Sequence, residues 1–295
     1  WTLNDLNLIR TKDKKIIQII EKKLNKIYLN KKYLKNTHYL FNKELLALIK
    51  KKQLINFLRK NFIQKMFFVH NRLFILKELL ELKKYKNWIL YKKLIKEDNV
   101  GDPVRYFLYP ESSGNKINHV YHLSILSNEF NLNLKKIDNV FEFGGGYGCM
   151  ARIFSKINKE IFFTCFDTSL VNLLQYYYLK HNNLDVGFSN KNRFRLISKI
   201  NKIKFNHSNS LFLANWSLSE VPINFRKKFY KLIVNSKVIL ISFQKKFENI
   251  DNLKYFINLK KKLGKGFRIK IIENKFYKGN IFRKQKHFFF IAKKL

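Results

Sequence analysis

The fold of this chain is decided by the stretch Val140–Gly148, which reads Val-Phe-Glu-Phe-Gly-Gly-Gly-Tyr-Gly. An apolar run with one acidic residue leads into a glycine-dense turn, and helical spacing of apolar residues resumes at Met150. Glycine lets the backbone turn tightly and lets a ligand approach its N–H groups without interference from a Cβ atom. The first N–H groups of the following helix have no intrahelical partner and favour an anionic group. The stretch therefore predicts a strand, a turn and a helix that bind a nucleotide-like cofactor.

The spacing of the glycines separates two classes of cofactor. A dinucleotide-binding turn has the pattern G-x-G-x-x-G, which would require glycine at position 149, where the chain has Cys149. The chain instead has the pattern acid-x-G-x-G-x-G from residue 142 to residue 148. This pattern resembles motif I of the class I S-adenosylmethionine-dependent methyltransferases. The resemblance implies that S-adenosyl-L-methionine is the cofactor and is bound by Gly144, Gly145, Gly146 and Gly148.

A second acidic residue is expected at the end of the next strand, where it would bind the two ribose hydroxyls of the cofactor. The apolar run Ile161–Phe166 is a strand candidate, and Asp167 follows it directly. The resemblance therefore implies that Asp167 binds the ribose. It also implies that Glu142 orders the glycine turn or binds the methionine amine.

From about residue 136 onward the chain alternates between strand and helix patterns. We expect seven strands, at residues 138–143, 161–166, 194–198, 210–215, 237–243, 268–275 and 286–292. Helices between strands predict a mostly parallel sheet covered on both faces. The last two strands are joined through Lys278-Gly279-Asn280 without room for a helix, so they should form an antiparallel hairpin. The sequence thus predicts an α/β, Rossmann-like sheet, which is also the arrangement that the methyltransferase resemblance implies.

The sequence divides into three regions. Residues 1–98 contain no proline or glycine and carry apolar residues at helical spacing, which predicts an N-terminal helical region. Residues 99–135 turn at Gly101-Asp102-Pro103 and stay loop-like to residue 115, before a helix over 117–130. We expect this polar segment to form a lid or acceptor site, with Gly101 and Gly114 as hinges. The resemblance implies that residues 136–295 are the S-adenosylmethionine-binding methyltransferase domain.

The formal charge is +40, from 60 lysines and arginines against 20 aspartates and glutamates. One interpretation is a polyanionic partner, either nucleic acid or an anionic membrane surface. The other is compositional drift, because the abundant residues have codons rich in A and T and the lysines are spread along the chain. We favour drift, while nucleic acid and peripheral contact with the inner membrane face stay open as alternatives.

The sequence shows no targeting or membrane signal. No segment reaches the roughly 18–20 apolar residues of a membrane-spanning helix, and no signal-peptide pattern precedes the first charges. Two cysteines are too few for a disulfide framework or a zinc cluster. These features predict a cytoplasmic protein.

The fourth expected strand opens abruptly into polar residues, at Asn215 and Trp216 and then Glu220. The Asn/Asp-Pro-Pro-aromatic signature of amino-methylating nucleic-acid enzymes is absent here, and no cysteine has the Pro-Cys setting of cytosine-C5 methylation. The whole pattern resembles the sugar O-methyltransferase family of bacterial surface-polysaccharide gene clusters. The shared features are Gly101-x-Pro103, the glycine stretch and the run Trp216-Ser217-Leu218-Ser219-Glu220.

Methylation of a hydroxyl requires a general base, because the proton of the hydroxyl must leave. His119 and His122 are three residues apart on one helical face. We prefer His122 as the base, because an imidazole titrates near cellular pH, and place Glu220 second. His119, Asn215 and Trp216 are expected to bind the acceptor. Packed histidines without a catalytic role are an equal alternative, and no metal site is expected.

The predicted function is O-methylation of a sugar hydroxyl on a glycan or on a nucleotide- or lipid-linked glycan precursor. The alternatives are an RNA methyltransferase, motivated by the charge, and a methyltransferase-like protein that binds without turnover.

Overall fold

The computed structural model describes residues 3–27, 37–67, 72–277 and 286–295, and the following account is restricted to them. The expected connection Lys278-Gly279-Asn280 lies outside these residues.

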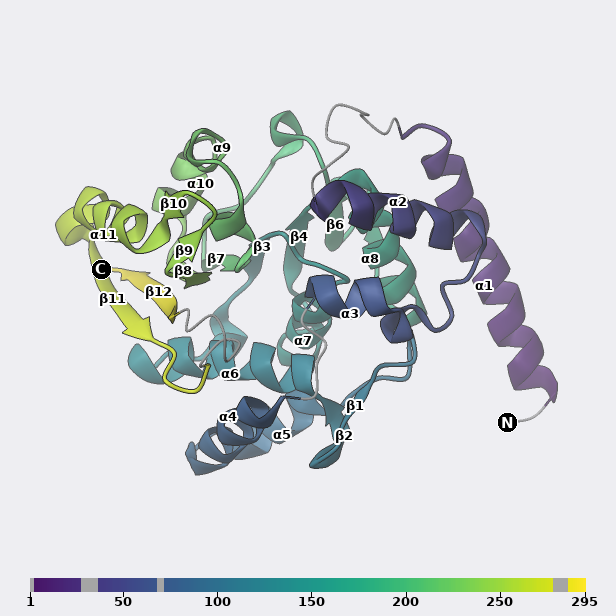
Figure 1. The fold of residues 1–295 in the computed structure, drawn as a ribbon, viewed down its shortest axis with the longest axis horizontal. Coiled ribbons are helices and arrows are strands. Elements are labelled where there is room, and N and C mark those ends of the chain that lie inside the picture. Colours follow the sequence, from purple (N-terminus) through teal and green to yellow (C-terminus); the bar gives the residue numbers. More distant parts are fainter. Residues whose placement is uncertain (1–2, 28–36, 68–71, 278–285) are drawn as a thin grey trace.

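The centre of the molecule is an eight-stranded sheet with the order β11-β12-β8-β7-β3-β4-β6-β5 (Figure 1). Strands β3 to β8 run parallel, and β12 is inserted antiparallel between β8 and β11. The mostly parallel sheet and its terminal antiparallel pair confirm the predicted fold class. The strands are β3 (Asn139–Phe143), β4 (Phe162–Phe166), β5 (Val186–Gly187), β6 (Phe194–Ile197), β7 (Ser210–Asn215), β8 (Val238–Gln244), β11 (Phe267–Glu273) and β12 (His287–Lys294).

The two-residue edge strand β5 is the one strand of this sheet that the sequence did not predict, because so short a segment has no readable alternation. The segment between β7 and β8 forms two short helices, α9 (Ile223–Lys227) and α10 (Tyr230–Asn235). At the break, the ring of Phe229 enters the core against Phe143 and Phe166, with centroids 4.8 and 4.9 Å away. Burial of this ring outweighs helix continuity here.

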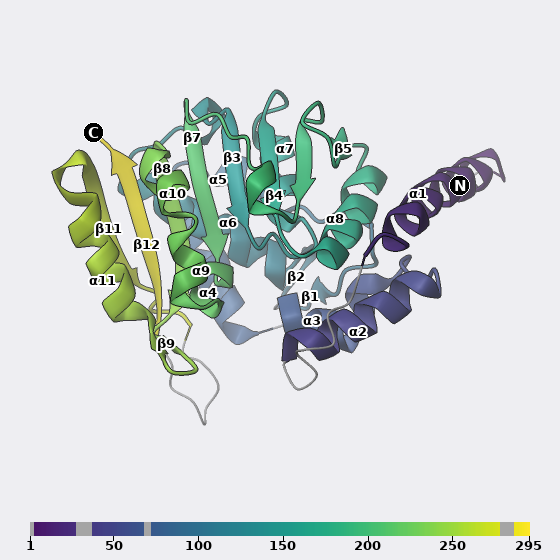
Figure 2. The ribbon, with the colours of Figure 1, turned by 90° about the horizontal axis from the view of Figure 1, so that it is seen from above.

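Alternate residues of the strands enter two hydrophobic clusters, one on each face of the sheet. Val140 packs under α6 (Gly114–Glu129), α7 (Cys149–Ile157) and α8 (Ser169–His181). Phe141 packs on the opposite face, which α9, α10 and α11 (Asn252–Leu263) cover. Figure 2 shows these two helical layers on either side of the sheet. The sheet is therefore buried on both faces, as expected for parallel strands.

The N-terminal third is helical, as predicted. Its apolar residues Ile20 and Leu45 belong to the same hydrophobic cluster as Val140, so these helices share one core with the sheet. Figure 2 shows α2 and α3 beyond the carboxyl ends of the parallel strands. The helices are α1 (Leu3–Leu24), α2 (Thr37–Lys50), α3 (Asn61–Phe67), α4 (Leu73–Lys84) and α5 (Trp88–Ile95).

The segment expected to be loop-like up to residue 115 instead forms a hairpin of β1 (Arg105–Tyr106) and β2 (Tyr109–Ser113). Helix α6 begins directly after it, and the Ser113 hydroxyl accepts the Lys116 backbone N–H as an N-cap. Most residues of α6 are buried, Gly114 included. Gly114 therefore lies in the buried first turn of a core helix, and the expected hinge at this residue stays a prediction.

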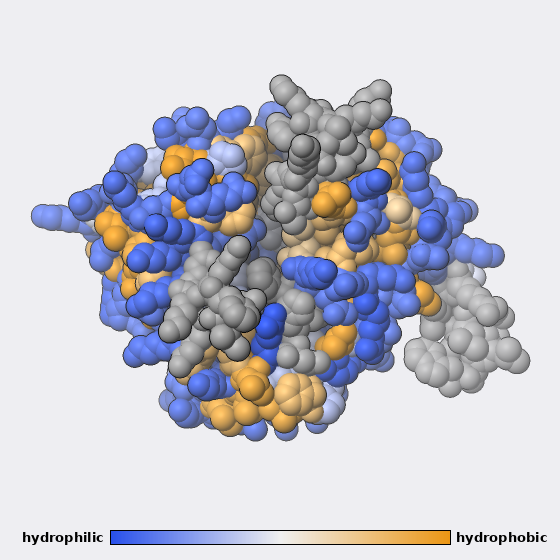
Figure 3. All heavy atoms as spheres, viewed as in Figure 1, coloured by the Kyte–Doolittle hydropathy of each residue, from blue (hydrophilic) through white to orange (hydrophobic). Residues whose placement is uncertain are grey.

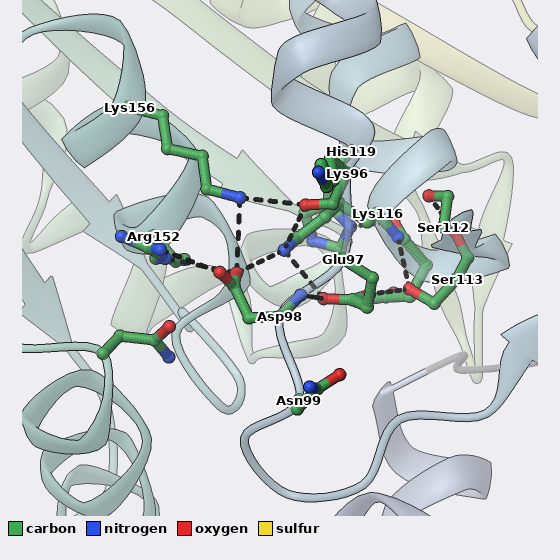
Figure 4. A network of polar contacts seen from close by, with 12 residues as sticks. Lys96, Glu97, Asp98, Asn99, Ser112, Ser113, Lys116, His119, Arg152 and Lys156 are labelled. Carbon is green, nitrogen blue, oxygen red and sulfur yellow. Dashed lines mark hydrogen bonds and ion pairs between the residues drawn. The ribbon is translucent and has the colours of Figure 1, made fainter. Parts of the chain in front are cut away.

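A buried charged network joins the end of the N-terminal region to α6 and α7 (Figure 4). Lys116 Nζ lies 2.7 Å from Glu97 Oε1 and 2.7 Å from Asp98 Oδ2, and Arg152 Nη2 lies 2.7 Å from Asp98 Oδ1. Burial alone would raise the pKa of Asp98, but the Arg152 hydrogen bond and the Lys116 charge hold it well below its usual range. Because a buried charge is costly without its partner, this network fixes residues 97–98 against both helices.

The surface is hydrophilic over most of the face in Figure 3, with separate hydrophobic areas between. The hydrophilic residues do not gather into one stripe on this face. Within the described residues no helix is long and apolar enough to cross a membrane.

Candidate functional site

The glycine turn lies at the carboxyl end of β3, in the middle of the sheet. Gly144, Gly146 and Gly148 have φ angles of +72°, +54° and +100°, in the left-handed region that favours glycine. A Cβ atom on Gly144 would lie 2.2 Å from Cβ of Ser217. Gly148 forms the N-cap of α7. The sequence pattern is therefore explained by backbone angles and by close packing of the turn.

The two predicted acidic residues meet at this turn. Glu142 is buried on β3, and its Oε2 would lie 2.6 Å from a Cβ atom on Gly145. Asp167 follows β4, and its Oδ1 accepts the Thr168 backbone N–H at 2.7 Å. Burial, and then the charge of Asp167, raise the pKa of Glu142 to about 8. Burial raises the pKa of Asp167 to about 7, although the N–H groups of Thr168, Gly146 and Gly145 oppose this.

Buried acceptors on β3 and on α8, the helix after Asp167, lack donors among the described residues. Oε2 of Glu142 is buried without a hydrogen-bond partner, and so are Oδ1 of Asn172 and Oε1 of Gln175 on α8. Gln175 Nε2 meanwhile donates to Gly146 O at 2.9 Å. A buried acceptor without a donor is costly. These groups fit a ligand that brings its own donors, such as an ammonium group and ribose hydroxyls.

Helix α3 packs against the turn from the N-terminal region. A Cβ atom on Gly146 would lie 3.1 Å from Cδ1 of Phe67, and the Phe67 ring lies 6.1 Å from the ring of Tyr147 and 5.4 Å from that of Phe41. Sequence analysis missed Phe67, because no local pattern distinguishes it from the other aromatic residues of the N-terminal helices.

A second group of residues lies at the carboxyl end of β7, and it joins three of the predicted acceptor-site residues. His122 on α6 places Nδ1 3.1 Å from Asn215 Oδ1, which also accepts the Ser242 hydroxyl at 3.2 Å. Because an amide oxygen only accepts, Nδ1 carries the imidazole proton and Nε2 presents a lone pair. Nε2 is buried without a hydrogen-bond partner in the described residues.

Trp216 follows Asn215 with φ +67°, a strained angle for a bulky residue. Its ring is nearly parallel to that of His122, with centroids 6.5 Å apart. It also lies 4.6 Å from the His287 ring and 5.2 Å from the Tyr277 ring. We call the rings of His122, Trp216, Tyr277 and His287 the aromatic cluster.

Sequence analysis missed His287 and Tyr277. His287 begins β12 and pairs with Gln244 at the carboxyl end of β8. Because β12 runs antiparallel, its first residue lies at the edge where the parallel strands end, which is the signal that could have found it.

The remaining predicted residues lie around this cluster. His119 Nδ1 lies 2.8 Å from Asn115 O in its own helix, and its ring lies 6.3 Å from that of His122. Glu220, in the 3-10 turn η5 (Ser217–Glu220), accepts Gln244 Nε2 at 3.3 Å. Glu220 and His122 thus bond different residues, Gln244 and Asn215.

An exposed histidine has a higher pKa than an exposed glutamate, but burial gives Glu220 the higher pKa of these two candidate bases. It lowers the pKa of His122 to about 3, with smaller contributions from the charges of His119 and His287. It raises the pKa of Glu220 to about 7. The sequence argument that His122 titrates near cellular pH is therefore wrong for this conformation. His122 stays neutral and able to accept a proton, whereas Glu220 titrates near pH 7. Among the described residues, no group of three histidine, cysteine or acidic side chains is placed to hold a metal ion.

Comparison of the sequence with protein-family models and with curated proteins finds no match. Among solved structures, a protein from Thermoplasma acidophilum is 13% identical, with 70% of this chain and 97% of that chain covered and a TM-score of 0.42. Precorrin-6y C5,15-methyltransferase from Geobacter metallireducens is 12% identical, with 61% and 88% covered and a TM-score of 0.39. Mitomycin 7-O-methyltransferase is 10% identical, with 61% and 58% covered and a TM-score of 0.35. At these identities and TM-scores, the fold class rests on the strand order of this chain itself.

Proposed function

We propose that this chain is an S-adenosylmethionine-dependent O-methyltransferase that acts on a sugar hydroxyl of a glycan or glycan precursor. The observation that carries the proposal is the glycine turn, in which left-handed glycines stand beside two carboxyl groups. One of these, Glu142, has a buried oxygen without a donor. When bound, S-adenosylmethionine supplies a methyl group on a positively charged sulfur, which an acceptor oxygen can displace in line.

At the cofactor side, Glu142 would accept hydrogen bonds from the ammonium group of the cofactor. Asp167 would accept them from its ribose hydroxyls. Binding of these donors favours ionised carboxylates, so it lowers the raised pKa values of both groups. The backbone N–H groups of the turn are already bonded within the chain: Gly144 donates to Phe166 O and Gly148 to Gly145 O, and those of Gly145 and Gly146 bond Asp167. The carboxyl groups therefore carry the proposed contacts with the cofactor.

At the acceptor side, His122 would accept the proton of the attacking hydroxyl on Nε2. Asn215 holds the imidazole in the tautomer that leaves Nε2 free. The Trp216 ring offers the flat apolar face on which a sugar ring packs. Since Nε2 is buried, the acceptor reaches it only when the rings around His122 move apart. Glu220 is the second candidate for the base, because its pKa lies near neutral pH.

Binding and transfer test the proposal separately. Thermal shift and calorimetry with S-adenosylhomocysteine should show saturable binding, and a nicotinamide dinucleotide should show none. Radiolabelled methyl should then pass from S-adenosylmethionine to glycan precursors. Transfer to RNA would support the alternative that the charge of +40 favours. Cofactor binding without transfer to either acceptor would support a binding protein, and the absence of cofactor binding would refute the proposal.

A further inference from the structure

A cavity lies at the amino ends of β3, β4 and β6, the opposite edge of the sheet from the glycine turn. Its volume is about 480 Å³. The first residues of two strands, Asn139 and Phe162, line it together with Arg195 of β6. In Figure 2 this edge faces away from α2 and α3. The cavity therefore lies outside the proposed methyl-transfer site.

The cavity exists because one crossover lacks a long helix. The connection from β6 to β7 contains only the 3-10 turn η4 (Ile200–Lys202), whereas α7 and α8 follow β3 and β4. Phe205 of this connection packs on the ring of Phe141, with centroids 5.8 Å apart, and lines the cavity beside Lys204. The connection thus covers the hydrophobic part of the sheet and leaves a polar recess next to it.

Arg195 carries a buried positive charge at this recess. The residue is 6% exposed, and its Nη1 donates to Asn190 Oδ1 at 2.6 Å while Nη2 donates to the Lys204 carbonyl. Both partners are neutral, and Nε has no partner in the described residues. Burial lowers the pKa of Arg195, and no carboxylate offsets this. A buried guanidinium without an anion is unfavourable.

Two more cations line the cavity. Arg193 Nη1 lies 3.3 Å from Glu160 Oε2, but the Glu160 side chain is 86% exposed, so this ion pair is weak. Nε and Nη2 of Arg193 have no partner among the described residues. The Asp185 carboxylate accepts the Arg193 backbone N–H at 3.0 Å and the Asn192 side chain at 2.9 Å. Arg193, Arg195 and Lys204 therefore bring three positive charges to the cavity. The carboxylates described beside them are those of Glu160, which is exposed, and Asp185, which is already hydrogen-bonded.

We propose that this cavity binds the phosphate group of a small phosphorylated organic molecule. Guanidinium groups match the geometry of phosphate oxygens, and the Thr164 hydroxyl and the asparagine amides add neutral donors. Phe162, which is 54% exposed, provides an apolar surface for the organic part. The volume suits a small molecule. A nucleic acid would require a continuous basic groove, whereas only three cations line this recess.

Calorimetry on the full chain at fixed ionic strength tests the site with uridine monophosphate, inorganic phosphate and uridine as probes. Uridine monophosphate should bind saturably and more tightly than inorganic phosphate, and uridine should not bind. Arg193→Gln and Lys204→Gln should each weaken binding about tenfold, because each removes a charge-assisted contact. Phe162→Ala should remove the advantage of the nucleotide over phosphate. Lys202→Gln, an exposed lysine of η4 outside the cavity, is the matched control and should leave binding unchanged.

The proposal would be overturned if uridine monophosphate showed no saturable binding, or if the Arg193 and Lys204 variants bound it as tightly as wild type does. Equal affinity for uridine monophosphate and inorganic phosphate would overturn the assignment to an organic phosphate, and binding of an oligoribonucleotide alone would point to nucleic acid instead. Arg195→Gln removes the buried charge but can impair folding, so the test rests on the two other variants. S-adenosylhomocysteine binding should be the same in all these variants, so failure here is distinguishable from failure of the proposed function.

Discussion

The glycine turn and the aromatic cluster occupy the same edge of the sheet but are built in opposite ways. The turn consists of consecutive residues plus Asp167 at the end of the neighbouring strand. The cluster joins His122 of α6, Trp216 after β7 and His287 of β12. Burial acts on both, raising the pKa of the carboxyls in the turn and lowering that of the imidazoles in the cluster. The comparison teaches that burial at this edge favours the neutral form of both kinds of group.

The largest expected effect separates the two regions by function. His122→Ala should lower methyl-transfer turnover by roughly 10²–10⁴, the usual contribution of a general base. Its affinity for S-adenosylhomocysteine should stay near wild type, because His122 belongs to the cluster and not to the turn. Steady-state kinetics and calorimetry measure the two quantities. His207→Ala, in the loop before β7, is the matched control and should retain full turnover. Equal loss of cofactor affinity in His122→Ala would break the division between the regions.

The reciprocal change is Asp167→Ala in the turn. It should weaken S-adenosylhomocysteine binding by about 1–3 kcal/mol, since it removes hydrogen bonds to the ribose. Calorimetry checks this, with Asp138→Ala at the opposite end of the sheet as the control that should bind normally. Unchanged affinity in Asp167→Ala would mean that the ribose is bound elsewhere.

The pH dependence of turnover distinguishes the two base candidates. With His122 as base, turnover at saturating substrate should be nearly constant between about pH 5 and 8, because its pKa of about 3 keeps it unprotonated. With Glu220 as base, turnover should fall about tenfold per pH unit below its pKa of about 7. Glu220→Gln identifies the group: it should abolish such a fall if Glu220 causes it. A flat profile in wild type excludes Glu220 as the base.

The smallest effect is on the stability of the ligand-free chain, and the two regions should give it opposite signs. The raised pKa of Glu142 adds stability that is fully present below its unfolded value of 4.5 and is lost as the pH rises through about 8. The lowered pKa of His122 adds stability that is present above 6.5 and is lost as the pH falls toward about 3. From pH 6.5 to 8 the carboxyls of the turn titrate and the imidazoles of the cluster do not, so the turn should lower the stability as the pH rises.

Chemical denaturation at several pH values measures this slope. Glu142→Gln, which is neutral at every pH and similar in shape, should make the decrease between pH 6.5 and 8 shallower and leave the slope below pH 4.5 unchanged. A conservative replacement of His122 should change the pH dependence of stability only below about pH 6.5. An unaltered upper slope in Glu142→Gln would show that the turn is already ionised in the free protein.

Much of the cofactor side could be predicted from sequence because its signals are local. The strand, the glycines and the acid of Val140–Gly148 are consecutive, and left-handed angles at three glycines leave a pattern that can be read without the fold. The aromatic cluster was only half predicted: the sequence singled out His122 in a helix pattern and Trp216 after a readable strand. Tyr277 and His287 could be placed only by the antiparallel insertion of β12 beside β8.

By itself the sequence determined the class of fold, seven of the eight strands of the sheet, and the position of the glycine turn. These follow from hydrophobic periodicity and from backbone requirements, which act over a few residues. Tertiary structure alone decided that α6 is a core helix, that Phe67 packs on the turn, and that burial sets the pKa of His122 and Glu220. It also decided the cavity around Arg195. Burial and charge depend on segments far apart in the chain, so no local pattern could report them.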